Sequence, residues 1–161
     1  MSQKQIRESE CSKAVRSILK PFYDVLRIES RLEDGFADLL GVRRRDGVTL
    51  FIELKQVDHL GKDGAVRLPL DPNQPLFAWQ RVKECEHSGV FIMIRVGSEI
   101  CYTFPARLET DWVPWIKSRI KPESLSPPLC FRHRVSEIPP VLDKAWGARF
   151  TPALLPGAGQ R

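Results

Sequence analysis

The chain has 161 residues, a formal net charge of +5 and a pI near 9.2. This length predicts one domain with a substantial core, and 42% hydrophobic with 28% charged residues is typical of a soluble globular protein. No apolar run approaches the ~20 residues that would cross a bilayer, and the first residues lack the apolar region of a signal peptide. The small basic excess favours an anionic partner.

The first part of the chain predicts a helix followed by three strands. Apolar residues recur at helical spacing over residues 3–20, and Pro21 then ends the helix. Residues 23–28 are typical of a strand. Two further strands are predicted at about 36–43 and 48–56, joined by Asp46-Gly47, because Asp-Gly between strand-like runs is a strong hairpin signal.

The middle of the chain predicts a helix between two buried strands. A long connection rich in glycine and proline, residues 57–75, precedes a helix expected over about 76–88. Continuous apolar residues at 90–96 suit a strand covered on both faces, and 100–104 is expected to pair beside it. This order predicts an α/β fold with a central mixed β-sheet flanked by helices.

The last third of the chain is rich in proline and is predicted less firmly by pattern. Nine of the 13 prolines lie at or beyond Pro105. A helix is expected over 112–120, and the final forty residues look extended or loosely ordered. We therefore expect a core over residues 1–104 and a proline-rich extension over 105–161, packed on the core or trailing from it.

The segment Phe51-Ile-Glu-Leu-Lys55 has an unusual distribution of charge. Strand side chains alternate, so Glu53 and Lys55 share one face while the leucine and isoleucine neighbours enter the core. If Asp46-Gly47 is a two-residue loop, Asp38 lies opposite Lys55 and diagonal to Glu53. Any even loop length keeps these three side chains on one face.

Two carboxylates this close repel each other unless a cation lies between them. Mg²⁺ prefers oxygen ligands and binds through one or two carboxylates while keeping several waters. Such an ion activates water and polarises a phosphoryl oxygen, and Lys55 would add positive charge beside the phosphate. The residues therefore predict a divalent-metal site that cuts phosphodiester bonds, with Mn²⁺ as a substitute. An exposed Glu-x-Lys surface pair is the ordinary alternative.

Gly35-Phe-Ala-Asp38-Leu, followed by Phe51-Ile-Glu53-Leu-Lys55, resembles the PD-(D/E)XK nuclease superfamily. Within it the chain is most similar to phage-type and VRR-NUC-like nucleases related to Holliday-junction resolvases. Ala37 departs from that pattern, which usually has proline there. The resemblance covers roughly residues 22–104 and implies a restriction-endonuclease-like core.

The resemblance also implies roles for further residues. Glu29 would assist Asp38 and Glu53 at the metal, with Glu10 of the first helix as its rival. Gln80 is the first choice for a helix glutamine that orients water or phosphate. Gln74 is a second choice, because prolines flank it closely.

What the resemblance implies for function is hydrolysis of DNA, leaving a 5′-phosphate and a 3′-hydroxyl, on branched or junction DNA by a homodimer. Phosphate contacts are expected from basic residues near the site: Arg43, Arg44, Arg45, Lys62, Arg67 and Arg81. A non-catalytic nucleic-acid-binding or assembly protein with an idle site is the alternative. Four cysteines without a CxxC motif predict reduced thiols in the cytoplasm, the host's if the chain is phage-encoded.

Overall fold

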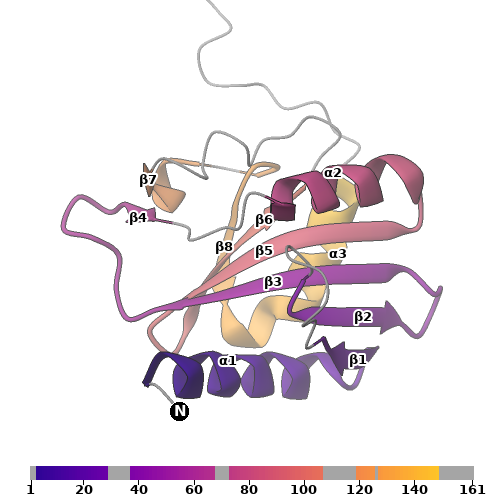
Figure 1. The fold of residues 1–161 in the computed structure, drawn as a ribbon, viewed down its shortest axis with the longest axis horizontal. Helices are drawn as coiled ribbons and strands as arrows, with labels where there is room; N and C mark the ends of the chain where they lie inside the picture. Colours follow the sequence, from indigo (N-terminus) through magenta and orange to yellow (C-terminus); the bar gives the residue numbers. More distant parts are fainter. Residues whose placement is uncertain (1–2, 29–36, 68–72, 107–118, 126, 149–161) are drawn as a thin grey trace, which may run out of the picture.

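The computed structural model describes residues 3–28, 37–67, 73–106, 119–125 and 127–148. A six-stranded sheet forms its centre, in the spatial order β1-β2-β3-β5-β6-β8 (Figure 1). Only β3 and β5 pair in parallel, while the other neighbours are antiparallel. The strands are β1 Tyr23–Arg27, β2 Leu39–Arg43, β3 Thr49–Val57, β5 Ser88–Val96, β6 Ile100–Pro105 and β8 Phe131–Arg134.

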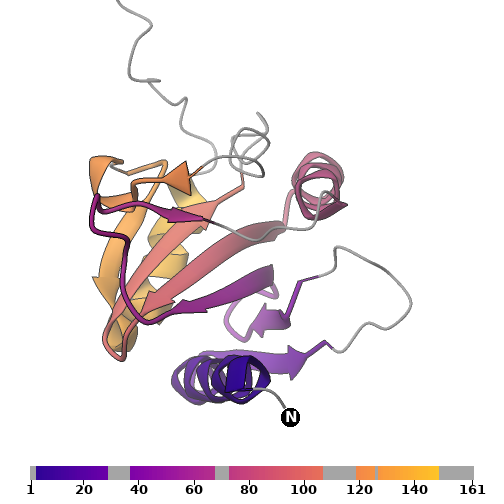
Figure 2. The same cartoon turned by 60° about the vertical axis from the view of Figure 1, so that its left-hand side comes forward.

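Three helices cover the two faces of this sheet. Helices α1 (Gln3–Leu19) and α3 (Ile138–Ala148) pack on one face. Helix α2 (Asn73–Glu84), which connects the parallel strands β3 and β5, packs on the other face. Figure 2 shows α1 nearly end-on at one side of the sheet and α2 at the opposite side. The result is the mixed α/β sandwich that the sequence predicts.

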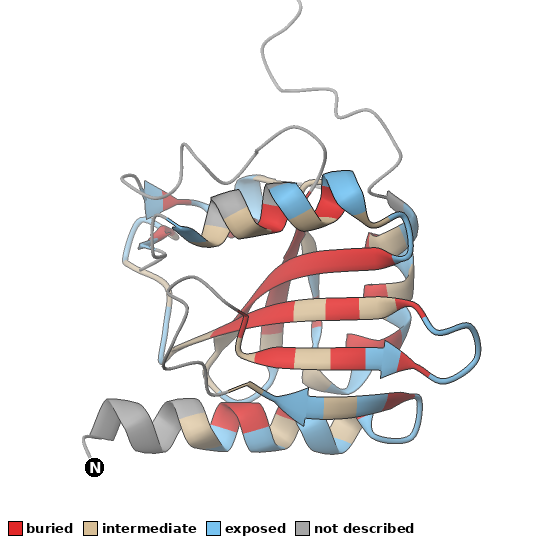
Figure 3. Cartoon of the chain, turned by 45° about the vertical axis from the view of Figure 1, so that its right-hand side comes forward, coloured by how far each residue is buried: buried red, intermediate tan, exposed pale blue. Residues whose placement is uncertain are grey.

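The core consists of two apolar clusters separated by the sheet. Leu50, Ile52 and Leu54 of β3 are buried against α1 and α3, as their alternation predicts. Helix α1 contributes Cys11 and Val15 to this cluster at helical spacing. Strand β5 is buried on both faces, whereas the edge strand β1 is largely exposed (Figure 3).

Several predicted elements have different boundaries in the structure. Helix α2 begins at Asn73, three residues before the predicted start. Residues 119–120, expected to end a helix, form strand β7 (Arg119–Ile120), which pairs with β4 (Val66–Arg67) in a small second sheet. The other residues of the predicted helix, 112–118, lie outside the described residues.

The prediction that the final forty residues are extended or loosely ordered is wrong for 138–148, which are helical, while 131–134 are extended as a strand of the main sheet. Residues 131–134 form β8 at the edge of the main sheet, and 138–148 form α3 on the core. Pro139 and Pro140 lie in the first turn of α3, where a missing backbone N–H costs no helical hydrogen bond. Two short 3₁₀ helices, Pro122–Ser124 and Val135–Glu137, complete this part of the chain. None of the helices in the described residues is long and apolar enough to cross a membrane.

The β2–β3 hairpin has a longer turn than predicted. Arg43, not Arg45, pairs with Val48, and four residues including Gly47 at φ 72° form the turn. The register is therefore shifted by two residues, so Leu40 lies opposite Phe51 instead of Glu53. Because the turn length is still even, the predicted sharing of faces is kept.

Candidate active site

Three functional side chains meet where β3 extends beyond its neighbour β2. Strand β2 begins at Leu39, opposite Ile52, while β3 continues to Val57. Asp38 directly precedes β2, and continuing the register by one residue brings it opposite Glu53. Asp38, Glu53 and Lys55 are thus brought together, with Asp38 opposite Glu53 instead of Lys55.

Hydrogen bonds fix these side chains at the uncovered end of β3. The Leu54 backbone N–H, which no β2 residue reaches, donates to Asp38 Oδ2 at 2.7 Å. Lys55 Nζ donates to Glu53 Oε1 at 2.5 Å. Glu53 is only 5% exposed, and the Lys55 side chain is 19% exposed. Glu53 and Lys55 therefore form a largely buried ion pair beside Asp38, and not an exposed surface pair.

The Glu53 carboxyl is held in an environment that disfavours its charge. Burial raises its pKa above the ordinary value, the nearby Asp38 carboxylate raises it further, and contacts with Lys55 and Gln74 lower it. Burial is the largest of these influences. The Asp38 and Glu53 carboxylates repel each other, and a cation between them would remove that repulsion, with the Lys55 ammonium group and the pocket-lining Arg27 as the positive charges of the protein nearby.

A pocket of about 110 Å³ opens between α1, Asp38 and the end of β3. Asp38, Lys55 and Arg27 line it together with Ser12 and Gln56, whereas Glu53 is not part of this lining. Ser12 is 6% exposed, yet its Oγ has no hydrogen-bond partner, and neither does Gln56 Oε1. Buried polar atoms are rarely left unsatisfied, so these two oxygens mark a place for water, metal hydration or substrate.

Ser12 and Gln56 were not found by sequence reasoning. The signal for Ser12 is weak: serine is unfavourable inside a helix, and here it lies beside the buried stripe that includes Cys11 and Val15. Gln56 directly follows Lys55, but nothing in the local pattern separates it from an ordinary strand residue.

The two candidate glutamines have different positions on α2. Gln74, in the first turn, hydrogen-bonds to the Glu53 side chain. Gln80 lies farther along the helix and is exposed. The structure therefore places the second choice, not the first, at the carboxylate cluster.

Of the two candidates for an additional carboxylate, Glu10 is the one within the described residues, and it does not line the pocket. Glu29 lies outside the described residues. Glu10 is exposed on α1 and lines a neighbouring depression with Gln56 and Asp58. Ser12, two residues after Glu10 on α1, lines the pocket itself.

The donor atoms at this site are oxygens. Within the described residues, no group of three or more His, Cys, Asp or Glu side chains is arranged to hold a metal. Asp38 and Glu53 supply two carboxylates, and Gln56, on the other face of β3 from Glu53, supplies an unsatisfied amide oxygen to the pocket that Asp38 lines. Oxygen-only donors with room for water suit Mg²⁺ or Mn²⁺ and do not suit metals that prefer sulfur or nitrogen.

Arg43 has a structural position at the opposite end of the hairpin, which corrects its prediction as a phosphate contact. It is 4% exposed, and its guanidinium donates to Asp46 at 2.7 Å and to Asp143 Oδ1 at 2.5 Å. Its Cζ also lies 5.0 Å from the Trp146 ring centroid. Three of the five guanidinium N–H groups are used in these bonds, and the side chain is buried, so Arg43 is not presented to DNA.

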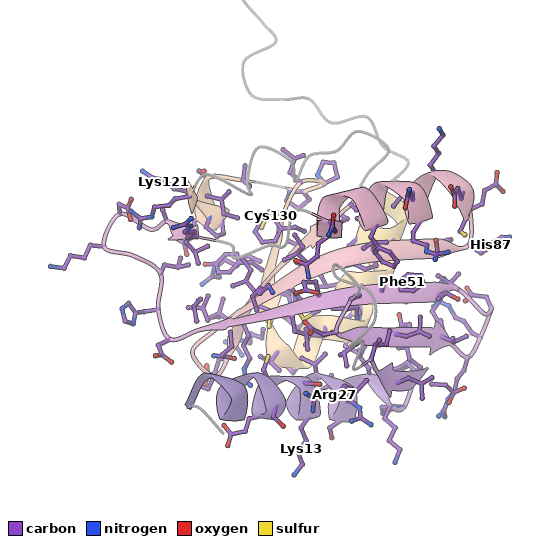
Figure 4. The ribbon with its side chains drawn as sticks, in the orientation of Figure 1. Lys13, Arg27, Phe51, His87, Lys121 and Cys130 are labelled. Carbon is purple, nitrogen blue, oxygen red and sulfur yellow. The ribbon has the colours of Figure 1, made fainter. Side chains whose placement is uncertain are left out.

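The other predicted basic residues are accessible to different degrees. Arg44 and Arg45 are more than half exposed and pair with Asp24 and Asp143 respectively. Lys62, which precedes β4, and Arg67, which lies on β4, are both exposed. Arg81 is partly buried, with its Cζ 5.3 Å from the Phe77 ring centroid and 6.0 Å from that of Phe51, whose position on β3 Figure 4 marks.

No protein-family model matches this sequence, and no curated protein matches it significantly. Among solved structures, the fold is similar to Hjc of Archaeoglobus fulgidus, a Holliday junction resolvase from an archaeal hyperthermophile. The TM-score is 0.55 at 13% sequence identity, over 81% of this chain and 98% of that one. With its mixed sheet of six strands flanked by helices, the chain has a restriction-endonuclease-like fold.

Proposed function

We propose that this protein is a divalent-metal-dependent DNA endonuclease, in which Asp38, Glu53 and Lys55 perform phosphodiester hydrolysis. The observation that supports this most strongly is a pair of adjacent carboxylates at an open strand end, Glu53 buried with a raised pKa and Asp38 beside a pocket with unsatisfied oxygens. The similarity of the fold to a Holliday junction resolvase supports the same reaction class. Fold alone does not specify function, so the proposal depends on the site.

Each residue of the candidate active site has a defined task in this proposal. Asp38, fixed by the Leu54 N–H, and Glu53, fixed by Lys55 and Gln74, hold the cation. When bound, Mg²⁺ or Mn²⁺ supplies charge stabilisation and an acidified water. Lys55 holds its ammonium group beside the scissile phosphate and offsets the charge that develops there. Gln74 keeps the Glu53 carboxylate oriented, and Ser12 and Gln56 accept or donate hydrogen bonds to water in the pocket.

Branched or junction DNA is the substrate class that we propose. This part of the proposal depends on the similarity to the archaeal resolvase, and on a basic surface beside the site rather than a base-reading element. A panel of labelled linear, flapped and four-way DNA molecules of matched sequence tests it directly. Equal cleavage of all three would restrict the proposal to a structure-independent endonuclease.

The central test compares wild-type protein with Asp38→Asn and with Glu86→Gln. Asparagine keeps an oxygen that accepts the Leu54 N–H, so the fold is expected to survive. Glu86 is exposed on the connection between α2 and β5, and its substitution makes the same change in charge away from the pocket. We expect Mg²⁺-dependent nicking from the wild type and from Glu86→Gln, and none from Asp38→Asn. Failure of wild-type protein to cut any DNA in the panel would reject the proposal.

Metal binding gives a second readout that does not require cleavage. A ligand that binds only the folded state raises stability by RT ln(1 + [L]/Kd), about 2.7 kcal/mol at 100 times Kd. Mg²⁺ or Mn²⁺ should therefore raise the melting temperature of the wild type and Glu86→Gln, but not of Asp38→Asn. Equal DNA affinity with and without Mg²⁺, together with no cleavage, would favour the non-catalytic binding or assembly protein instead.

A homodimer is included in the proposal because a four-way junction offers two equivalent strands, and closed two-fold symmetry would present two sites to them. Sedimentation of the protein with and without a four-way junction tests this point. A monomer that cuts both strands independently would remove the dimer while leaving the proposed chemistry intact.

A further inference from the structure

A groove of about 560 Å³ lies between α1 and β1, beside the candidate active site. Lys13 and Arg16 of α1 and Lys20, directly after the end of α1, line one side of it, and Asp24 and Leu26 line it from the strand. We propose that this groove binds the phosphate backbone of the DNA arm that leads into the active site. The proposal rests on the nuclease function and specifies a contact surface for its substrate.

The groove has more positive charge than its own carboxylate can neutralise. Arg44, which also lines it, forms an exposed ion pair with Asp24 at 2.8 Å. Asp24 is the one acidic residue in the lining. In the parts of the chain that the structure describes, Lys13, Arg16 and Lys20 have no acidic partner.

These three cations repel one another along one side of the helix. They are exposed and lie three and four residues apart, a spacing at which like charges destabilise a helix by a few tenths of a kcal/mol per pair. A polyanion in the groove would remove this repulsion. Figure 4 shows Lys13 extending outward from α1, with Arg27 at the adjoining end of β1.

The groove is continuous with the catalytic pocket along both of its walls. On the helix, Ser12, Arg16 and Lys20 form one row at four-residue spacing, of which Ser12 lines the pocket and the other two line the groove. On β1, Val25 lines the groove, and Arg27, on the same face two residues later, lines the pocket. A chain of phosphates lying in the groove would therefore arrive at Asp38 and Lys55.

The length of the charged row suits a nucleic-acid strand. Lys13 and Lys20 are seven residues apart, which is about 10 Å along a helix at 1.5 Å per residue. One DNA strand has about three phosphates in that axial length, at 3.4 Å each. The three cations therefore match, in number and in total length, about three successive phosphates of one DNA strand next to the scissile bond.

The test measures salt-dependent binding with Arg16→Ala/Lys20→Ala, the pair farther from the pocket. Arg132→Ala/Lys144→Ala is the matched control, because it removes two exposed cations from β8 and α3. Affinity for a fluorescent four-way junction is measured by anisotropy in EDTA across a range of KCl concentrations. Each lost phosphate contact lowers the slope of log K against log[salt] by about 0.9.

We expect the slope for Arg16→Ala/Lys20→Ala to fall by about 1.8, and affinity near 0.1 M KCl to fall about tenfold or more. The control should keep the wild-type slope, and Arg16→Lys/Lys20→Arg should keep it too, because charge and not side-chain identity is needed. Equal losses of slope and affinity in the test and control variants would overturn the proposal that the groove binds DNA, since DNA binding would then depend only on the overall charge of the protein. Loss of binding to vesicles containing anionic lipid, with an unchanged DNA slope, would assign the groove to a membrane surface and also overturn it.

The outcome is separable from the nuclease proposal because the binding assay contains no metal and no cleavage. An unchanged slope with wild-type cleavage intact would remove the groove alone. A reduced slope with no wild-type cleavage would remove the hydrolysis and leave the groove as a DNA-binding surface.

Discussion

The β2–β3 hairpin has a charged cluster at each end. The surroundings favour the ionised forms of Arg43 and Asp46 in one cluster and disfavour the ionised form of Glu53 in the other. At the turn, the Arg43 guanidinium is bonded by Asp46 and Asp143, and Trp146 lies against it. Hydrogen bonds from Arg43 lower the pKa of Asp46 to about 2, and those same bonds raise the pKa of Arg43. Each of these charged groups is ion-paired with a group of opposite charge.

At the other end of the hairpin, the environment disfavours the ionised form of a buried carboxyl group. Glu53 has a raised pKa because of its burial and the nearby Asp38 carboxylate, although Lys55 forms an ion pair with it. The pocket beside them has unsatisfied oxygens on Ser12 and Gln56. One cluster is complete without a ligand and the other is not, which is how a structural ion network differs from a candidate site.

The strongest way to break this comparison is Glu53→Gln. We expect the cleavage rate to fall about 100-fold or more, equivalent to about 3 kcal/mol of lost transition-state stabilisation, because a metal-binding carboxylate is removed. Stability should be kept or rise, since a buried charge with a raised pKa is removed and glutamine still accepts from Lys55. Single-turnover cleavage and thermal melting measure the two effects. A variant that melts well below the wild type would show that Glu53 is structural.

Arg43→Met should give the reverse result. Removing one partner of a fully buried pair costs about 3–5 kcal/mol. We expect about 2–4 kcal/mol here, because the side chains of Asp46 and Asp143 are 39% and 33% exposed and solvent screens them. Denaturant unfolding measures the loss, and cleavage below the melting temperature should keep the wild-type rate. A selective loss of DNA binding would restore Arg43 as a phosphate contact.

The same hairpin shows how far the sequence predicts the site. The alternation of β3 and an even turn length were enough to bring Asp38, Glu53 and Lys55 together. The register was missed by two residues because Asp46 accepts from both Arg43 and the Val48 N–H, which lengthens the turn. Asp143, which completes that cluster, lies 100 residues away from Arg43, so no local pattern includes it.

Proline was the other source of error. Flanking prolines made Gln74 the weaker candidate, yet Pro75 lies in the first turn of α2 and helps to begin the helix. Pro139 and Pro140 do the same for α3, in a region expected to be extended. At both places the apolar residues after the prolines needed a sheet face to pack on, which local composition does not show.

A smaller effect distinguishes the two glutamines on α2. Gln74→Ala removes the hydrogen bond to Glu53, and bonds to charged groups contribute about 1.5–3 kcal/mol. We expect a cleavage rate about tenfold lower or more, and weaker binding of Mn²⁺ measured by calorimetry. Gln80→Ala, on the exposed part of the same helix, is the control and should leave both values unchanged. The opposite pattern would return the role of helix glutamine to Gln80.

The smallest effect is a difference in titration between the two ends of the hairpin. Asp46 has a folded-state pKa of about 2, lowered from 3.8, so its stabilising contribution is present above 3.8 and is lost as pH falls through 2. Glu53 has a pKa raised above 4.5, so its contribution is present below 4.5 and is lost as pH rises through the raised value. Carboxyl ¹³C NMR of the metal-free protein should show Asp46 ionised throughout the range in which Glu53 titrates. Adding Mg²⁺ should move the titration of Glu53 to lower pH and leave Asp46 in place, because only the Glu53 carboxyl has an environment that disfavours its charge and that a cation would offset. Glu53 titrating at or below 4.5 without metal would mean that Lys55 already neutralises the site, and the hairpin would then have two structural clusters.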